Sequence, residues 1–284
     1  MQRNPFRPPG ILAPALLMTV LLPLACAPER QEGDPQINEL AEEVSENPDD
    51  AELRFRFGLA FLELEPPDLE QAAEQFAEAT YLAPAWSRAY YNHGVVLAEL
   101  EHYNEAQAAF ERAVELEPDY APAWSNLGLI HHLNARYTEA VEAFRRALAV
   151  DPDYYEARFN LGCSYEKLRD MPRAAEAYEA AVAINPEAPP AYHNLARMYY
   201  IAGRYEEAVE KLERLDELRP DNPPTLYNLY RCHTALGNVA EAEAYYKRAT
   251  TIDPRYTEIP LESHEFIPME ELERQGYLLS PAEE

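Results

Sequence analysis

The chain has 284 residues and a formal net charge of −27 at pH 7, because 51 acidic side chains outweigh 24 basic ones. A surface this negative repels phosphate backbones and anionic lipid headgroups at long range. We therefore expect no nucleic-acid partner, and we expect membrane contact only through the N-terminus.

The N-terminal residues 1–25 carry Arg3 and Arg7 and then an apolar run over 11–25. A basic start followed by a short apolar core is typical of a secretory signal peptide. The run is shorter than the ~20 residues that span a bilayer, and an uncleaved signal segment is the alternative. Residues 26–35 are polar and contain proline and glycine, which predicts a flexible tether.

The residues before Cys26, Leu-Pro-Leu-Ala, resemble a bacterial lipobox, in which the cysteine becomes the lipidated first residue. The resemblance predicts lipidation of Cys26. Because the next residue, Ala27, is not the aspartate of an inner-membrane retention signal, it further predicts an outer-membrane lipoprotein facing the periplasm. Cleavage after Ala27 would instead release a soluble periplasmic protein. Both alternatives place the chain in the bacterial cell envelope.

In the segment 36–50, residues 36–46 carry apolar side chains at helical spacing, Ile37, Leu40 and Val44 among them. We expect an N-terminal capping helix here, because the first unit of a stacked array lacks a neighbour on its outer side.

From residue 51 the chain repeats with a period of 34 residues. Apolar residues three and four apart form two stripes in each unit, and a proline follows the second stripe, which predicts two helices per unit. A fixed period of this length indicates a solenoid of stacked units rather than one globular core. The six units are 51–86, 87–120, 121–154, 155–188, 189–222 and 223–256.

The third unit shows the recurring pattern best, with Trp124, Leu127, Gly128, Ala140, Phe144, Ala147 and Pro152. This pattern resembles the tetratricopeptide repeat, and with the N-terminal segment the chain resembles exported bacterial lipoproteins of that family. The resemblance implies an all-α, right-handed superhelical solenoid of six helix-turn-helix repeats, with capping segments at both ends. In this family the first helix of each repeat lines a concave wall.

The inward positions implied by the resemblance carry one asparagine per repeat from the second onwards, namely Asn92, Asn126, Asn160, Asn194 and Asn228. An amide side chain offers donors and an acceptor that match a peptide group. The ladder predicts that an extended peptide is held by its main chain. Five net hydrogen bonds of ~1 kcal/mol each predict micromolar or weaker affinity. The alternative is that these asparagines serve the fold alone.

Further inward positions are aromatic or basic, with the cations confined to repeats four to six: Tyr91, Phe159, Lys167, His193, Arg197, Tyr200, Tyr227 and Arg231. Such a wall suits a free carboxylate or acidic side chains of a protein or peptide partner, because arginine offers a two-pronged contact. The alternative is that these cations pair with neighbouring acids such as Glu166.

Residues 257–284 break the repeat. We expect this C-terminal tail to cap the last unit. The alternative is that part of it lies in the groove and competes with a ligand.

The chain has no HExxH motif, no glycine-rich phosphate loop and no nucleophile elbow, so we expect no enzyme, no metal site and no cofactor. We predict a non-enzymatic protein–protein interaction scaffold of the cell envelope that binds a peptide or protein in its groove. The alternative is a structural assembly subunit of a pilus, secretin, outer-membrane or cell-wall complex. Such a subunit would pack through its convex face or edges and leave the groove idle.

Overall fold

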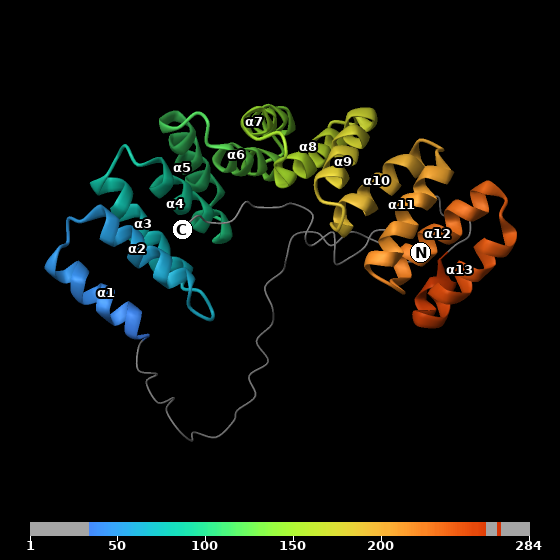
Figure 1. The fold of residues 1–284 in the computed structure, drawn as a ribbon, viewed down its shortest axis with the longest axis horizontal. Helices are drawn as coiled ribbons and strands as arrows, with labels where there is room; N and C mark the ends of the chain where they lie inside the picture. Colours follow the sequence, from blue (N-terminus) through green and yellow to red (C-terminus); the bar gives the residue numbers. More distant parts are fainter. Residues whose placement is uncertain (1–33, 260–265, 268–284) are drawn as a thin grey trace, which may run out of the picture.

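The structure is a computed structural model that describes residues 34–259 and 266–267. These residues form 13 α-helices, one short 3-10 helix and no strand (Figure 1). The elements are α1 (Pro35–Glu46), α2 (Ala51–Leu62), α3 (Leu69–Leu82), α4 (Ser87–Glu99), α5 (Tyr103–Leu116), α6 (Ala121–Leu133), α7 (Tyr137–Val150), α8 (Tyr155–Lys167), α9 (Met171–Ile184), α10 (Pro189–Ile201), α11 (Tyr205–Leu218), α12 (Pro223–Leu236), α13 (Val239–Ile252) and η1 (Pro254–Glu258).

From α2 onwards the helices pair as six hairpins, which stack side by side into an arch (Figure 1). First helices of neighbouring hairpins touch one another, as α4 touches α6 and α6 touches α8. Such contacts are expected on the shorter, inner arc of a curved stack. The predicted all-α solenoid of paired helices is confirmed, and the first helix of each pair faces the inside of the arch.

In each of the first four hairpins, a glycine on the first helix packs against an aromatic ring on the second helix. A β-carbon at Gly128 would lie 2.8 Å from the ring of Phe144, and one at Gly162 would lie 2.6 Å from the ring of Tyr178. Real β-carbons do not approach a ring so closely, so any side chain there would push the two helices apart. In the fifth hairpin Ala196 and Leu212 take the corresponding positions, and both are fully buried.

The turn inside each hairpin from the second to the sixth contains one residue with positive φ. Glu101, Ala135 and Arg169 adopt this conformation in repeats two to four, and Gly203 and Gly237 do so in repeats five and six. The left-handed region is costly for residues with a β-carbon and free for glycine. The same turn is therefore strained in three repeats and relaxed in two.

Both ends of the arch are covered. At one end α1 buries Leu40 and Val44 against the first hairpin. It ends at Glu46, because Pro48 steers the residue before it out of the helical region. At the other end Ile259, just after η1, is buried against Leu226, Tyr227 and Ala249.

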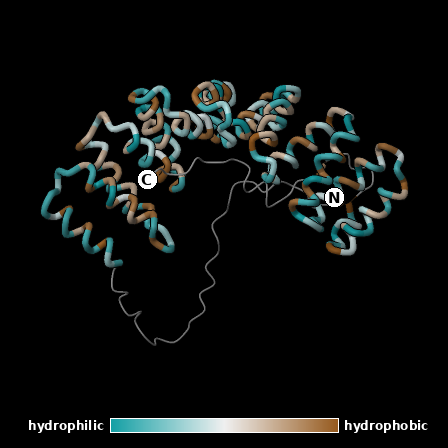
Figure 2. The backbone as a smooth tube through the Cα atoms, viewed as in Figure 1, coloured by the Kyte–Doolittle hydropathy of each residue, from teal (hydrophilic) through white to brown (hydrophobic). Residues whose placement is uncertain are grey.

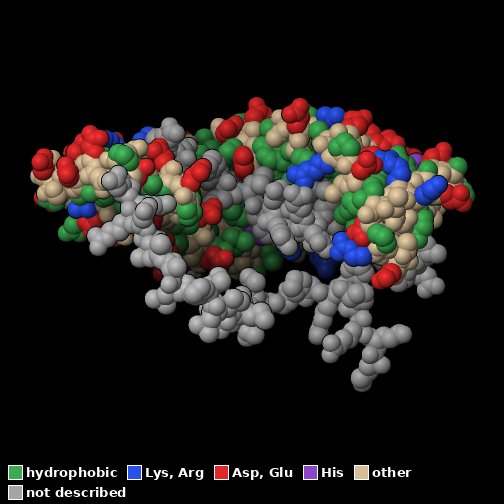
Figure 3. All heavy atoms as spheres, turned by 90° about the horizontal axis from the view of Figure 1, so that it is seen from below, with side chains coloured by type: hydrophobic (Ala, Val, Ile, Leu, Met, Phe, Trp, Pro, Cys, Tyr) green, Lys and Arg blue, Asp and Glu red, His purple; other side chains and the backbone are tan. Residues whose placement is uncertain are grey.

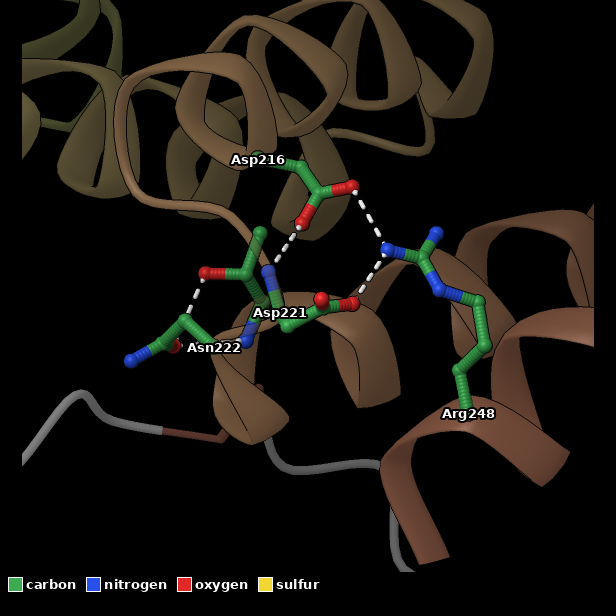
Figure 4. Close-up of polar contacts among 5 residues, drawn as sticks. Asp216, Asp221, Asn222 and Arg248 are labelled. Atoms are coloured by element: carbon green, nitrogen blue, oxygen red, sulfur yellow. Dashed lines mark hydrogen bonds and ion pairs between the residues drawn. The ribbon is translucent and has the colours of Figure 1, made fainter. Parts of the chain in front are cut away.

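A polar brace fixes the last hairpin to the one before it (Figure 4). The Arg248 guanidinium on α13 lies 3.3 Å from a carboxylate oxygen of Asp216 on α11 and 2.7 Å from one of Asp221 in the α11–α12 loop. The backbone N–H of Asp221 donates to the other carboxylate oxygen of Asp216 at 3.1 Å. These contacts fix α12 relative to the preceding repeat.

Apolar and polar stretches alternate along the helices of the arch (Figure 2). Within the described part of the chain, no helix combines the length and the apolar character that a bilayer crossing requires. The predicted signal peptide 1–25, Cys26 and nearly all of the tether 26–35 lie outside the described residues, as does most of the tail 257–284.

Candidate functional site

The two halves of the arch differ in net charge. Residues 34–150 hold seven Lys and Arg against 23 Asp and Glu, a net charge of −16, whereas residues 151–259 hold 13 against 19, a net charge of −6. Viewed from the open side of the arch, Lys and Arg side chains are more frequent over the C-terminal half (Figure 3). An acidic segment is therefore repelled least by repeats four to six.

The asparagine ladder is less open than predicted. Asn92, Asn126 and Asn160 are fully buried, and Asn194 is half-buried. The amide of Asn126 on α6 donates to the hydroxyl of Tyr91 on α4 at 3.4 Å, because the two first helices approach closely on the inner arc. In this structure a ladder exposed along its whole length is not present.

The fifth asparagine, Asn228 on α12, is also fully buried, and it holds a peptide group of the tail. Its Nδ2 donates to the carbonyl oxygen of Ile267 at 2.8 Å, and its Oδ1 accepts from the N–H of Ile267 at 2.8 Å. The side-chain amide thus forms hydrogen bonds with both the N–H and the C=O of one residue in the C-terminal tail. This is the two-sided main-chain pairing expected of an asparagine rung.

The residue before that contact, Phe266, lies against the inner side of α10. Its ring centroid is 5.3 Å from that of His193 in an edge-on arrangement and 5.6 Å from that of Tyr200. Arg231 on α12 donates to the Tyr200 hydroxyl at 3.1 Å, and its guanidinium lies 5.5 Å from the centre of the Tyr200 ring. Repeat five thus supplies the pocket of His193 and Tyr200 around Phe266, and Arg231 of repeat six contacts the Tyr200 side of this pocket.

His193 acts in this pocket as a neutral ring. Burial and the nearby Arg197 guanidinium lower the pKa of His193 to about 3. Among the described residues its Nδ1 atom has no hydrogen-bond partner. An uncharged imidazole packs against Phe266 without the desolvation cost that a buried cation would carry.

Arg197, predicted to bind a ligand carboxylate, is already paired. Its guanidinium contacts Glu166 on α8, and Glu166 also accepts a hydrogen bond of 2.6 Å from the hydroxyl of Tyr178. The same hydroxyl lies 3.3 Å from the sulfur of Cys163, whose pKa burial raises to about 12. The alternative reading, a cation neutralised by Glu166, holds for Arg197. Its role is to join α8 to α10.

Three aromatic residues predicted for the groove belong to the core beneath it. Tyr91, Phe159 and Tyr227 are buried, and each ring packs against an aromatic ring on the second helix of its own hairpin, at centroid distances of 5.9, 5.6 and 6.3 Å. These positions turn towards the helix pair instead of the open side. Lys167, at the end of α8, is exposed.

Sequence reasoning assigned no site role to Phe266 and Ile267, although it allowed a tail in the groove. The signal was a pair of apolar residues followed by Pro268, outside the 34-residue period and without helical spacing. Within the described residues, no group of three or more His, Cys, Asp or Glu side chains is arranged to hold a metal ion.

Family models for the tetratricopeptide repeat match residues 91–155, 134–189, 159–223 and 199–259. The chain is similar in structure to YrrB, a tetratricopeptide-repeat protein with an unusual peptide-binding site. The TM-score is 0.59 at 23% identity, over 65% of this chain and 95% of that one.

It is also similar to PilF of Pseudomonas aeruginosa, with a TM-score of 0.61 at 20% identity over 75% of this chain and 97% of that one. For PilW, a widely conserved type IV pilus biogenesis factor, the values are 0.58, 24%, 72% and 94%. No curated protein matches the sequence. At these identities the likeness shows the fold.

Proposed function

The chain belongs to the tetratricopeptide-repeat family, and on this premise we propose that it is a non-enzymatic scaffold that binds an extended segment of a partner protein along α10 and α12. The repeat is typically an interaction module, and the surface that this chain offers is the inner side of its last repeats.

The observation that carries the proposal is the pairing of Asn228 with the peptide group of Ile267. Both bonds go to main-chain atoms, so a guest of any sequence with a free N–H and C=O could make them. The neighbouring ring pocket of His193 and Tyr200 adds side-chain selectivity. Main-chain pairing combined with one side-chain pocket is a general mode of peptide recognition.

Two cations remain part of the proposed site in altered roles. Arg231 orients Tyr200, and Arg197 holds α8 and α10 together through Glu166. The half-buried Asn194 and the exposed Lys167 are the predicted residues best placed to meet a partner beyond the pocket. We therefore propose that a peptide enters over Asn194 and that its carboxylates, where present, lie near Lys167.

We propose further that the protein works in the bacterial cell envelope, exported by residues 1–25 and anchored through Cys26. The lipobox-like residues support the anchor, and the likeness to PilF and to the pilus biogenesis factor PilW supports an envelope role. Mass spectrometry of the mature N-terminus tests the anchor. A lipid-modified Cys26 at the mature N-terminus is expected, and an unmodified N-terminus after Ala27 would contradict it.

Photo-cross-linking in the native cell tests the binding surface. The amino acid p-benzoylphenylalanine is placed at Asn194 on the inner side of α10, and in a control strain at Val239, an exposed residue at the start of α13. We expect a protein partner to be captured from Asn194 and not from Val239. Because Asn228 also holds the tail through Ile267, its role is tested in a strain that carries Phe266→Ala, where adding Asn228→Ala is expected to reduce the capture.

Capture from Val239 alone would overturn the proposal. It would support the alternative role, a structural subunit of an envelope complex that packs through its outer helices. Capture from Asn194 that is unaffected by Asn228→Ala would contradict the assignment of the site to α12.

A further inference from the structure

We propose that the site on α10 and α12 recognises an aromatic residue followed by an aliphatic residue in an extended chain, and that Phe266 and Ile267 occupy it as a built-in competitor. This inference rests on the proposed function and names both the ligand class and its regulation. Phe266 and Ile267 of the tail occupy the same positions on α10 and α12 that an external peptide would occupy.

The main-chain contact selects for a residue that is not proline at the second position. Asn228 accepts from the N–H of Ile267 and donates to its C=O, both at 2.8 Å. Proline has no N–H and would leave the buried Oδ1 atom without that bond. The guest residue over Asn228 must therefore carry a free backbone amide.

The ring contact selects for an aromatic residue at the first position. Phe266 is 9% exposed and packs on His193 and Tyr200, which lie on the repeat before the one that holds its neighbour. The Ile267 side chain packs instead with the cluster around Leu226 and Tyr227. Two adjacent guest side chains thus enter two different hydrophobic clusters, one in each repeat.

Covering the last hairpin does not account for the position of Phe266. Ile259, seven residues before Phe266, already fills the exposed end of the core between α12 and α13. Phe266 then reaches back to α10, where the pocket belongs to repeat five. An end cap would stop at the last repeat, whereas a guest spans neighbouring first helices.

Charge favours the same placement. Residues 260–284 hold seven Asp and Glu and one Arg, a net charge of −6. Phe266 and Ile267, the tail residues that the structure describes, contact repeats five and six, which lie in the half of the arch whose net charge is −6 rather than −16. We therefore expect the external ligand to be an acidic segment that contains the aromatic–aliphatic pair.

Fluorescence anisotropy with a dye-labelled synthetic peptide of the sequence of residues 262–271 tests the proposal on the full chain. An attached tail acts at an effective concentration on the order of 1 mM. If the peptide itself binds with an affinity of about 10–100 μM, the tail should weaken its binding about 10- to 100-fold. We therefore expect the Phe266→Ala chain to bind the peptide at least about tenfold more tightly than the unaltered chain.

A matched pair of variants isolates the backbone amide. Ile267→Ala and Ile267→Pro both remove the side chain, but only Ile267→Pro removes the N–H that Asn228 accepts. We expect the Ile267→Pro chain to bind the labelled peptide more tightly than the Ile267→Ala chain. A peptide with proline in place of the isoleucine should bind neither chain.

The pocket is tested in a chain whose tail has been released. Adding Asn228→Ala to Phe266→Ala removes two hydrogen bonds and is expected to weaken peptide binding roughly 30-fold. Circular dichroism melting of every variant checks that the hairpins remain folded, since Phe266 and Ile267 lie outside them.

Equal affinity for the unaltered and Phe266→Ala chains would overturn the competition. Absence of peptide binding to every chain would overturn the aromatic–aliphatic preference. In either case a partner cross-linked from Asn194 would still support the proposed function. Loss of that cross-link together with tight peptide binding would instead contradict the proposed function alone.

Discussion

Repeat three and repeat five have the same length and the same two helices, yet they close their hairpins differently. Repeat three places Phe144 against Gly128, whereas repeat five uses Leu212 with Ala196. Leucine is smaller than phenylalanine, and the methyl group of alanine in place of glycine partly compensates for the lost volume. The comparison teaches that the hairpin core tolerates exchange in pairs, while the period of 34 residues is kept.

The halves of the arch that contain these two repeats also differ in net charge and in the contacts of their first helices. Repeats one to three lie in the more acidic half, whereas the inner helices of repeats five and six carry the ring pocket and the occupied asparagine. The repeated core therefore supports an N-terminal half that extends the arch and a C-terminal half that holds a guest. Four experiments test how far this division goes.

Replacing the residues that pack between the two helices of repeat five should give the largest change in the free energy of unfolding. Leu212→Phe places an aromatic ring against the β-carbon of Ala196, and overpacking of this kind costs about 1–3 kcal/mol. Adding Ala196→Gly recreates the pair found in repeat three and should recover much of the loss. Urea unfolding of the single and double variants measures the coupling. Simple additivity of the two substitutions would contradict the pairwise closure.

Buried histidines in both regions should make stability fall with acid. Burial first, and then nearby cations, lower the pKa of His193 to about 3 and of His132 to about 4, below the 6.5 of an unfolded chain. Between pH 6.5 and these values the unfolded chain binds protons that the folded chain does not, so the free energy of unfolding decreases as pH falls. Each histidine should contribute about 2 kcal/mol of loss at pH 5.

Substitution separates the two contributions. His193→Gln and His132→Gln should each flatten the decline in stability between pH 7.5 and 5, while His102→Gln, at an exposed position, should leave it unchanged. Chemical unfolding at both pH values provides the measurement. A decline of the same steepness in the His193→Gln chain would show that the imidazole beneath Phe266 is not the group responsible.

Exchange of turn residues should change stability by about 1 kcal/mol in opposite directions. Ala135→Gly relieves a positive φ of 58° in repeat three, whereas Gly203→Ala creates the same strain in repeat five, where a β-carbon would meet no other atom. Thermal melting should therefore shift upwards for Ala135→Gly and downwards for Gly203→Ala. Two shifts of the same sign would contradict the strain argument.

The smallest effect is expected from the brace at Arg248. Its side chain is 44% exposed and its contacts with Asp216 and Asp221 are screened by solvent, so Arg248→Ala should cost at most about 1 kcal/mol. The loss should vanish in 1 M salt. Arg146→Ala breaks a more exposed pair within α7 and serves as the control, with about half that effect or less. A larger loss for Arg146→Ala would contradict a brace between repeats.

The fold was predictable because each hairpin repeats the same physical solution. Prolines and apolar stripes at a period of 34 residues indicated the helix pairs, and the structure explains the recurring Gly128 by its close approach to the Phe144 ring. The apolar spacing of Ile37, Leu40 and Val44 likewise indicated the helix that the structure shows as α1.

The candidate site was less predictable, because position in the repeat does not decide what a side chain meets. The pattern placed Tyr227 on the groove wall, yet its ring packs with Tyr230, Tyr246 and Tyr256 at the end of the arch. The pattern also offered Arg197 as a free cation, although Glu166 comes from the preceding repeat. Contacts between repeats, and with a tail outside the period, are not contained in the periodicity.

The order of the hairpins also fixes where the guest is offered. The helix α1, next to the N-terminal segment, covers one end of the arch, and α12 lies towards the other (Figure 1). In a chain anchored before α1, the binding surface on α10 and α12 would therefore be separated from α1 by the intervening hairpins. Inserting a hairpin near α2 would increase the distance between α1 and α12 and leave the affinity of the site on α10 and α12 unchanged.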